Sequence, residues 1–232
     1  MFIRYLELLT RNMEVQNKFY TEVLELPVEV TSSGVRVKAG QTELLFMQAP
    51  PDFDGAYHFA FNIPENQFGA AKGWISNRVP LLRDASGSDE FPSESWNSDS
   101  VYFKDAAGNV LEFIARHNLK DAVEGDFDGS QILCVSEIGL PSEDVLAFAN
   151  ELCTRLGLSV FRQQPNENFT PIGDDHGLLI LPAKDRIWKP DSGVPAKLLP
   201  VSVQGETHGR RWTVRGVPYE IMGSSPIMDP PG

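Results

Sequence analysis

The feature that most constrains the fold of this chain is an internal repeat. Residues 5–13 have the pattern of a strand that leads into a helix ending near Leu26, and the segment that begins at Glu137 repeats this pattern, with its helix ending near Leu158. The copies are offset by 132 residues, as from Tyr5 to Glu137, without a gap over more than twenty positions. A chain with such a repeat is expected to form two related domains of about 110 residues each.

A polar, glycine-containing segment between the copies is typical of a linker. We therefore divide the chain into a first domain at residues 1–118, a linker at 119–131 and a degenerate second domain at 132–225. In the first domain a strand and an amphipathic helix precede three short strand patterns, and the cycle restarts at Tyr57. The order βαβββ, twice per domain, predicts an α+β fold because most strands follow one another directly.

Composition limits the classes of partner. The chain has 20 Lys and Arg against 32 Asp and Glu, so its net charge is −12, and an acidic surface repels nucleic acid. No apolar run approaches the roughly 18 residues that a membrane span needs. Arg4, Glu7 and Arg11 interrupt any signal-peptide core. We expect a cytoplasmic protein that binds a small molecule rather than nucleic acid or a membrane.

Three stretches carry a resemblance to a known family: residues 19–26, 57–61 and 101–114. The last is the most specific, with an aromatic strand, an Asp-Ala-Ala-Gly-Asn turn and Glu112 on the next strand; Ala106 stands where proline is usual. In these features the chain resembles the vicinal oxygen chelate superfamily of glyoxalases, extradiol dioxygenases and bleomycin-resistance proteins. The resemblance implies two tandem glyoxalase-like domains, in each of which paired βαβββ units form an incomplete eight-stranded barrel around a cup.

The resemblance also places metal ligands on the first, fifth and eighth strands of such a pair, here Tyr5, His58 and Glu112. A neutral phenol is a poor ligand for Fe2+, Mn2+ or Zn2+, so Glu7, on the same strand face as Tyr5, is the expected third ligand beside His58 and Glu112. Tyr5 and Glu7 could instead act as acid–base groups on the substrate. The alternative is that His58 and Glu112 only hydrogen-bond to each other and to Tyr5, without a metal.

The second copy offers a poorer site. Glu137 has the first-strand position and Glu220 the eighth, with no histidine between them. These carboxylates could hold a hard cation, but ion pairing with an arginine of segment 210–215 is the favoured interpretation. The segment 185–191 places Arg186 and Trp188 in a loop, where they could cover the cup; Trp188 could instead pack at the domain interface.

Two functions follow from the resemblance. The first is a metal-dependent enzyme, a dioxygenase or a glyoxalase-type lyase, acting on a small oxygen-rich substrate; the tandem layout slightly favours the dioxygenase. The alternative is a metal-free binding or sequestering protein of the bleomycin-resistance type, with walls formed by Tyr5, Tyr57, Phe59 and Trp96. In that case the net negative charge would favour a cationic or aromatic ligand. The resemblance allows a homodimer.

Overall fold

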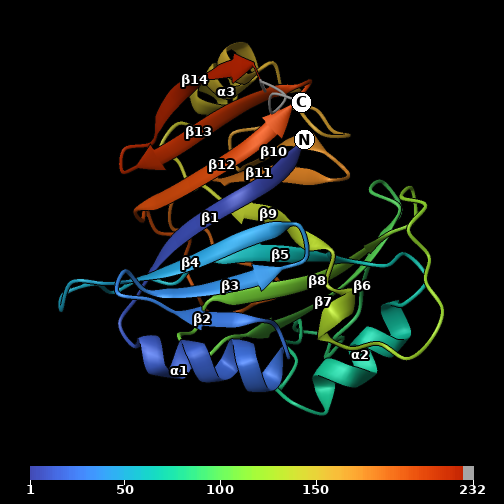
Figure 1. The fold of residues 1–232 in the computed structure, drawn as a ribbon. Coiled ribbons are helices and arrows are strands. Elements are labelled where there is room, and N and C mark those ends of the chain that lie inside the picture. The colour runs from blue at the N-terminus through green and yellow to red at the C-terminus, as the bar shows by residue number, and fades with distance from the viewer. Residues whose placement is uncertain (227–232) are drawn as a thin grey trace, which may run out of the picture.

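A computed structural model describes residues 1–226 and contains two curled seven-stranded sheets (Figure 1). Sheet A has the strand order β14 (Glu220–Pro226), β13 (Arg210–Gly216), β12 (Val201–Thr207), β1 (Phe2–Thr10), β4 (Thr42–Gln48), β3 (Val35–Ala39) and β2 (Val28–Val30). Sheet B has the order β10 (Phe169–Asp174), β11 (Gly177–Pro182), β9 (Cys134–Gly139), β5 (His58–Ile63), β8 (Val110–Arg116), β7 (Ser98–Lys104) and β6 (Phe91–Ser93). The predicted α+β class is confirmed.

The helices are short, and side chains cap the starts of α1 and α3. They are α1 (Met13–Lys18), which continues as the π-helical turn η1 (Phe19–Val23), α2 (Phe68–Ser76), the 3-10 turn η2 (Gly129–Gln131) and α3 (Val145–Leu156). Asn12 accepts a hydrogen bond from the Val15 amide at the start of α1, and Asp144 does the same for α3. Within residues 1–226, no helix is long and apolar enough to cross a membrane.

Each of the two sheets combines strands from before and after the predicted linker. Sheet A joins the first unit, residues 2–48, to the strands β12, β13 and β14, and β1 pairs antiparallel with β12. Sheet B joins the second unit, residues 58–116, to the third unit, residues 134–182, and β5 pairs antiparallel with β9. The predicted linker at residues 119–131 therefore separates the two copies of the sequence repeat. It does not separate the two sheets, since each sheet contains strands from before and after the linker.

Two of the four predicted βαβββ units are incomplete, so the expectation of four full units is wrong in this respect. In the third unit the strand expected after α3 is reduced to a single bridge between Val160 and Ile172. In the fourth unit β12 runs directly into β13 through the turn at His208 and Gly209, both of which have positive φ angles of 50° and 71°. A tight turn leaves no chain for a helix, and the unit becomes an antiparallel meander.

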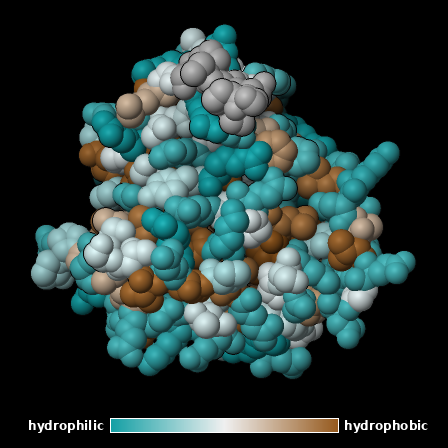
Figure 2. All heavy atoms as spheres, viewed as in Figure 1, coloured by the Kyte–Doolittle hydropathy of each residue, from teal (hydrophilic) through white to brown (hydrophobic). Residues whose placement is uncertain are grey.

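Strand alternation divides each sheet into a core face and an outer face. Leu6 and Leu8 of β1 lie in the same hydrophobic core as Phe59 and Phe61 of β5, so this core lies between the sheets. The side chain of Tyr5, next to Leu6 on β1, is therefore on the outer face of sheet A. The view in Figure 2 is of this side of the molecule, and hydrophilic side chains cover much of it, with hydrophobic ones between them.

Candidate functional site

Three strands of sheet B bring together three ionisable side chains: His58 on β5, Glu112 on β8 and Glu137 on β9. One ligand atom from each lies within 4.8 Å of the others, and the distance from His58 Nε2 to Glu112 Oε2 is 3.8 Å. The strand register explains the meeting, because Ala60 of the central strand lies opposite both glutamates. A small residue at that position leaves room for the two carboxylates to approach.

The imidazole of His58 presents an unprotonated nitrogen to this cluster. Its Nδ1 lies 3.0 Å from the carbonyl oxygen of Val110, which can only accept a hydrogen bond, so the proton is on Nδ1 and the lone pair on Nε2. Complete burial lowers the pKa of His58 to about 4, and the ring is therefore neutral at pH 7. A histidine held in this way by a backbone carbonyl is a typical arrangement for a metal ligand.

The two carboxylates carry more negative charge than their surroundings balance. Both side chains are buried, with Glu112 and Glu137 each 3% exposed. Burial and the neighbouring charge of Glu137 raise the pKa of Glu112, although the nearby hydroxyls of Ser100 and Tyr102 act in the opposite direction. Burial also raises the pKa of Glu137, against the effect of the Arg116 guanidinium. Buried carboxylates need a cation or donors, and here one arginine serves two of them.

That arginine is itself held in the sheet. Arg116, on β8, is 1% exposed; its Nη2 donates to Glu137, and its Nε donates to Asn62 Oδ1 at 3.1 Å. The Asn62 side chain in turn donates to the backbone oxygen of Asp175, at 3.0 Å. This chain of hydrogen bonds fixes the orientation of Glu137 while its carboxylate still faces the cluster.

The pairing of β5 with β9 relates the second and third units by an approximate twofold axis. The second unit supplies His58 on its first strand and Glu112 on its last strand. Glu112 lies opposite Ala60, which is two positions after His58. The third unit supplies Glu137 on its first strand, at the position equivalent to His58. The residue equivalent to Glu112 is Ile180, which lies opposite Gly139, two positions after Glu137. Isoleucine cannot bind a metal, so within residues 1–226 the site offers three protein ligands and leaves its remaining side open.

A cavity of about 560 Å³ lies over the open side of the cluster. Its aromatic walls are Phe91, Trp96, Tyr102, Phe169 and Trp188. The Trp188 ring lies over the His58 ring, with 4.7 Å between the centroids, and Gly139 makes room for it, since a Cβ there would be 2.4 Å from the indole. Both Arg186 and Trp188 line the cavity, as one of the two interpretations of their loop predicted.

Tyr5 and Glu7 are not brought to this cluster, and the prediction that they would converge with His58 and Glu112 is wrong. They lie on β1 in sheet A, where the Tyr5 hydroxyl donates to Glu7 Oε2 at 2.7 Å. The reason is the exchange of units between the sheets: β9, rather than β1, pairs with β5. Burial and the adjacent Glu7 raise the pKa of Tyr5, which keeps the phenol protonated.

The residue that the sequence reasoning misplaced is Glu137. The 132-residue offset equates it with Tyr5 and predicts it on the first strand of a separate second cup, whereas the structure places it beside His58. Glu220, its expected partner, is at the surface, 3.9 Å from Arg215, in the ion pair that was the favoured alternative. Of the predicted aromatic walls only Trp96 lines the cavity, since Phe59 is in the core between the sheets and the Tyr57 hydroxyl donates to a backbone oxygen.

Among the solved structures that match the chain are two that match it over nearly its whole length. One is a candidate dioxygenase from Bacillus subtilis, with 13% sequence identity and a TM-score of 0.61; the match covers 93% of this chain and 81% of that protein. The other is a variant of glyoxalase I from Zea mays, with 12% identity, a TM-score of 0.57 and coverage of 92% and 88%. At these identities the likeness shows a shared fold. No protein-family model and no curated protein matches the chain.

Proposed function

Because the chain has the fold of the vicinal oxygen chelate superfamily, we propose that it is a metal-dependent enzyme acting on a small oxygen-rich molecule. The observation that supports this most strongly is the cluster in sheet B. Two buried carboxylates face the unprotonated Nε2 of His58, and a single buried arginine partly balances their charge. A divalent cation would neutralise the excess charge and accept all three donors.

The residues that would bind the metal are His58, Glu112 and Glu137. One nitrogen and two carboxylate donors suit Fe2+, Mn2+ or Zn2+, and among these the oxygen-rich set favours Mn2+. When bound, the metal would supply Lewis-acid stabilisation of charge on two adjacent substrate oxygens. Its open positions would face the cavity, because the sheet occupies the other side.

Other residues in and beside the cavity would prepare the substrate for reaction. Arg116 orients Glu137, and Trp188 covers His58 and excludes water from that side of the site. Burial and the neighbouring carboxylates raise the pKa of Tyr102 well above its usual value, so this phenol stays protonated and can donate a hydrogen bond. No catalytic role is proposed for Tyr5 or Glu7, since both lie in sheet A.

The donor set bears on the class of reaction. The two structural relatives are named as a glyoxalase and a candidate dioxygenase. Non-haem iron oxygenases commonly use two histidines and one carboxylate, whereas this cluster has one histidine and two carboxylates. The difference favours Lewis-acid chemistry of the lyase or isomerase type over dioxygenation, and it reverses the slight preference that the tandem layout alone suggested.

The metal content of the purified protein tests the proposal. We expect near-stoichiometric Mn2+, Fe2+ or Zn2+ in protein prepared without chelators, and recovery of one of these ions after chelator treatment and supplementation under anaerobic conditions. Protein that takes up no metal would contradict the proposal. It would support the second candidate, a metal-free binding protein, in which Arg116 alone compensates Glu137.

A further inference from the structure

Two cationic side chains lie at the mouth of the cavity, Arg186 and Lys189, both on the loop at residues 183–196. Within residues 1–226, neither has a carboxylate oxygen within 4.0 Å, the limit for an ion pair. This differs from Lys184 on the same loop, which pairs with Glu143 at 3.1 Å. Arg186 and Lys189 thus bring unneutralised positive charge to the cavity entrance.

The guanidinium of Arg186 is held in place without an anion. It lies over the ring of Phe169, 4.8 Å from the centroid, and its Nη1 donates to the backbone oxygen of Asn168 at 3.2 Å. Phe169 also lines the cavity. Partial burial lowers the pKa of Arg186, in agreement with the absence of a carboxylate beside it in the described part of the chain.

The loop that carries these cations is fixed by contacts with two other segments. The amide of Ala85 donates to Asp191 Oδ2 at 3.0 Å, and Lys104 Nζ donates to the backbone oxygen of Ser192 at 2.9 Å. A binding group on a loop that is already ordered loses less conformational entropy when a ligand arrives. The cations at the mouth are therefore positioned before binding.

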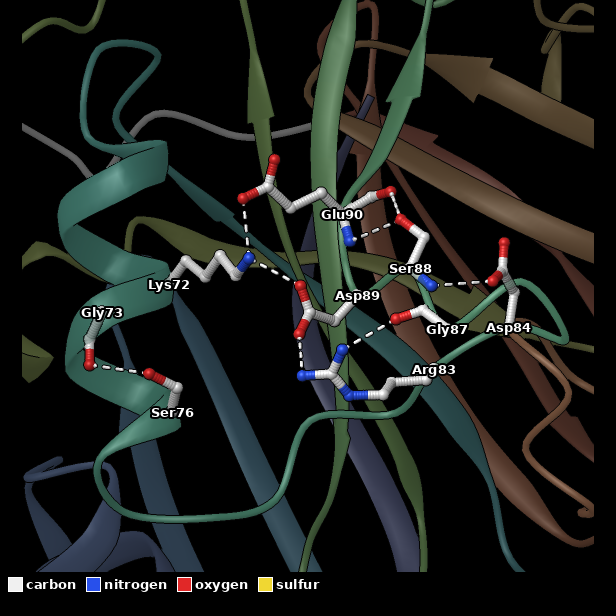
Figure 3. A network of polar contacts seen from close by, with 9 residues as sticks. All are labelled: Lys72, Gly73, Ser76, Arg83, Asp84, Gly87, Ser88, Asp89 and Glu90. Atoms are coloured by element: carbon white, nitrogen blue, oxygen red, sulfur yellow. Dashed lines mark hydrogen bonds and ion pairs between the residues drawn. The ribbon is translucent and has the colours of Figure 1, made fainter.

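The acidic residues at the mouth, in contrast, are already engaged (Figure 3). Glu90 lines the cavity, but its carboxylate accepts a hydrogen bond from Lys72 of α2 at 2.6 Å. Lys72 also contacts Asp89, which pairs with Arg83, so these four residues balance one another. The Asp84 carboxylate accepts hydrogen bonds from its own turn, including the amide of Ser88 at 2.9 Å. These groups offer little to a cationic ligand.

We infer that the cavity binds a small molecule with an anionic oxygen group, such as a carboxylate, sulfonate or phosphate, on an aromatic or apolar body. The anionic group would lie against Arg186 and Lys189, and the body against Phe169 and Trp188. This is the reverse of the cationic ligand that the net charge of −12 suggested. The inference deepens the proposed function. It rests on that function in one respect, namely that the reacting oxygens of the substrate lie beside His58, Glu112 and Glu137.

Benzenesulfonate and benzenesulfonamide provide a matched test, since they have nearly the same shape and differ in charge, and a sulfonate is a weak metal ligand. Binding of each is measured by calorimetry at low ionic strength, with benzylamine as the cationic probe and with chelator-treated protein. We expect benzenesulfonate to bind at least about tenfold more tightly than the sulfonamide, the ratio that about 1.4 kcal/mol of charge-assisted hydrogen bonding would give. Benzylamine should bind more weakly than either to the double variant Glu112→Gln with Glu137→Gln, in which the carboxylates at the base of the cavity cannot attract the ammonium group.

The variants locate the effect. Arg186→Gln should reduce the preference for benzenesulfonate to about twofold or less, and Lys189→Gln should reduce it partly. The control Lys184→Gln removes a charge from the same loop but outside the cavity, and should leave the preference unchanged. Equal binding of the two probes, a preference of the double variant for benzylamine, no binding of benzenesulfonate, or a preference that survives Arg186→Gln would each overturn the inference.

Repeating the titration with Mn2+ separates this inference from the proposed function. A charge preference that depends on Arg186 in protein that takes up no metal would contradict the metal-dependent enzyme and support the anionic ligand. Metal uptake without a charge preference would have the opposite meaning.

Discussion

The outer faces of the two sheets are built from equivalent strands but carry different side chains. In sheet B, β9 pairs antiparallel with β5, and this pairing brings Glu137 to His58. In sheet A, β1 pairs antiparallel with β12 in the same sense, and the equivalent positions hold Tyr5 and Ser202. One face thus combines an imidazole with carboxylates, whereas the other combines a phenol with a hydroxyl, neither of which is a strong ligand for a divalent metal.

The two faces also differ in how far other parts of the chain shield them from solvent, and this difference is as important as the difference in residues. The face of sheet B lies under the loop that carries Trp188, so its carboxylates are buried. On sheet A, Glu43 and Arg36 are partly exposed and lie 3.4 Å apart in an ordinary surface ion pair. Exposed charges are solvated and contribute little to stability, whereas buried ones need compensation. The comparison shows that burial, more than the number of carboxylates, distinguishes the candidate metal site.

The strongest test of this contrast removes one cation from each sheet. Arg116→Met leaves Glu137 buried without its partner, and we expect it to lower the free energy of unfolding of metal-free protein by about 3–5 kcal/mol. The matched change Arg215→Met breaks only the surface pair with Glu220 and should cost less than about 1 kcal/mol. Urea denaturation measures both. Similar losses for the two variants would mean that the buried pair is not special.

Loss of a carboxylate from each sheet should separate metal binding in the same way. Glu137→Ala is expected to weaken metal binding at least about 100-fold, because even groups that only orient ligands are worth about 10–100-fold. Glu7→Ala on sheet A should leave the affinity unchanged, since Glu7 contacts Tyr5 rather than the cluster. Competition with a chromogenic chelator gives both affinities. An equal effect of the two changes would place the metal elsewhere.

The pH dependence of stability should also differ between the faces. Folding raises the pKa of Glu112, so between the unfolded pKa of 4.5 and the higher folded pKa the native state binds more protons than the unfolded state. Metal-free protein should therefore lose stability as the pH rises through this window. Glu112→Gln cannot ionise and should be more stable than the parent at pH 9 by at least about 1 kcal/mol, since one unit of pKa shift corresponds to about 1.4 kcal/mol.

Thermal unfolding from pH 5 to pH 9 measures this effect. Ser202→Ala on sheet A removes no titratable group, serves as the control and should follow the parent at every pH. The lowered pKa of His58 acts at the other end of the range: the parent should lose stability as the pH falls from 6.5 towards 4, and Glu112→Gln should share that loss. A pH profile of Glu112→Gln that matches the parent would show that Glu112 is already ionised in the folded protein.

The smallest expected effect is that of Tyr5→His. If Tyr5 faced the metal, a histidine there would add a good ligand and raise metal affinity. The structure places it on the outer face of sheet A, so we expect no change in affinity beyond about twofold. A clear gain in metal uptake would show that the first and second units share a site after all.

Local patterns in the sequence were sufficient for part of this structure. The alternation of His58, Ala60 and Asn62 with Phe59 and Phe61 predicts which side chains leave the core, because that depends only on the pleat of one strand. The helix-entry segments likewise reveal the repeat. Local patterns do not predict which unit pairs with which, since the first strand of any unit could pair with the first strand of any other. That choice determined that Glu137, and not Glu7, meets His58.

The nested order of the strands has a consequence for how the chain can fold. All seven strands of sheet B come from residues 58–182, whereas sheet A needs β1 and β12, which are separated by roughly 190 residues of chain. Contacts between such distant segments form slowly, because a large loop must close first. During synthesis, sheet B can therefore assemble while β1 still has an unpaired edge, and β12 closes sheet A only after it has left the ribosome. A ribosome-bound chain from which residue 182 has left the exit tunnel, while residue 201 is still inside it, should thus have a sheet B core that is protected from proteolysis and an N-terminal strand that is not.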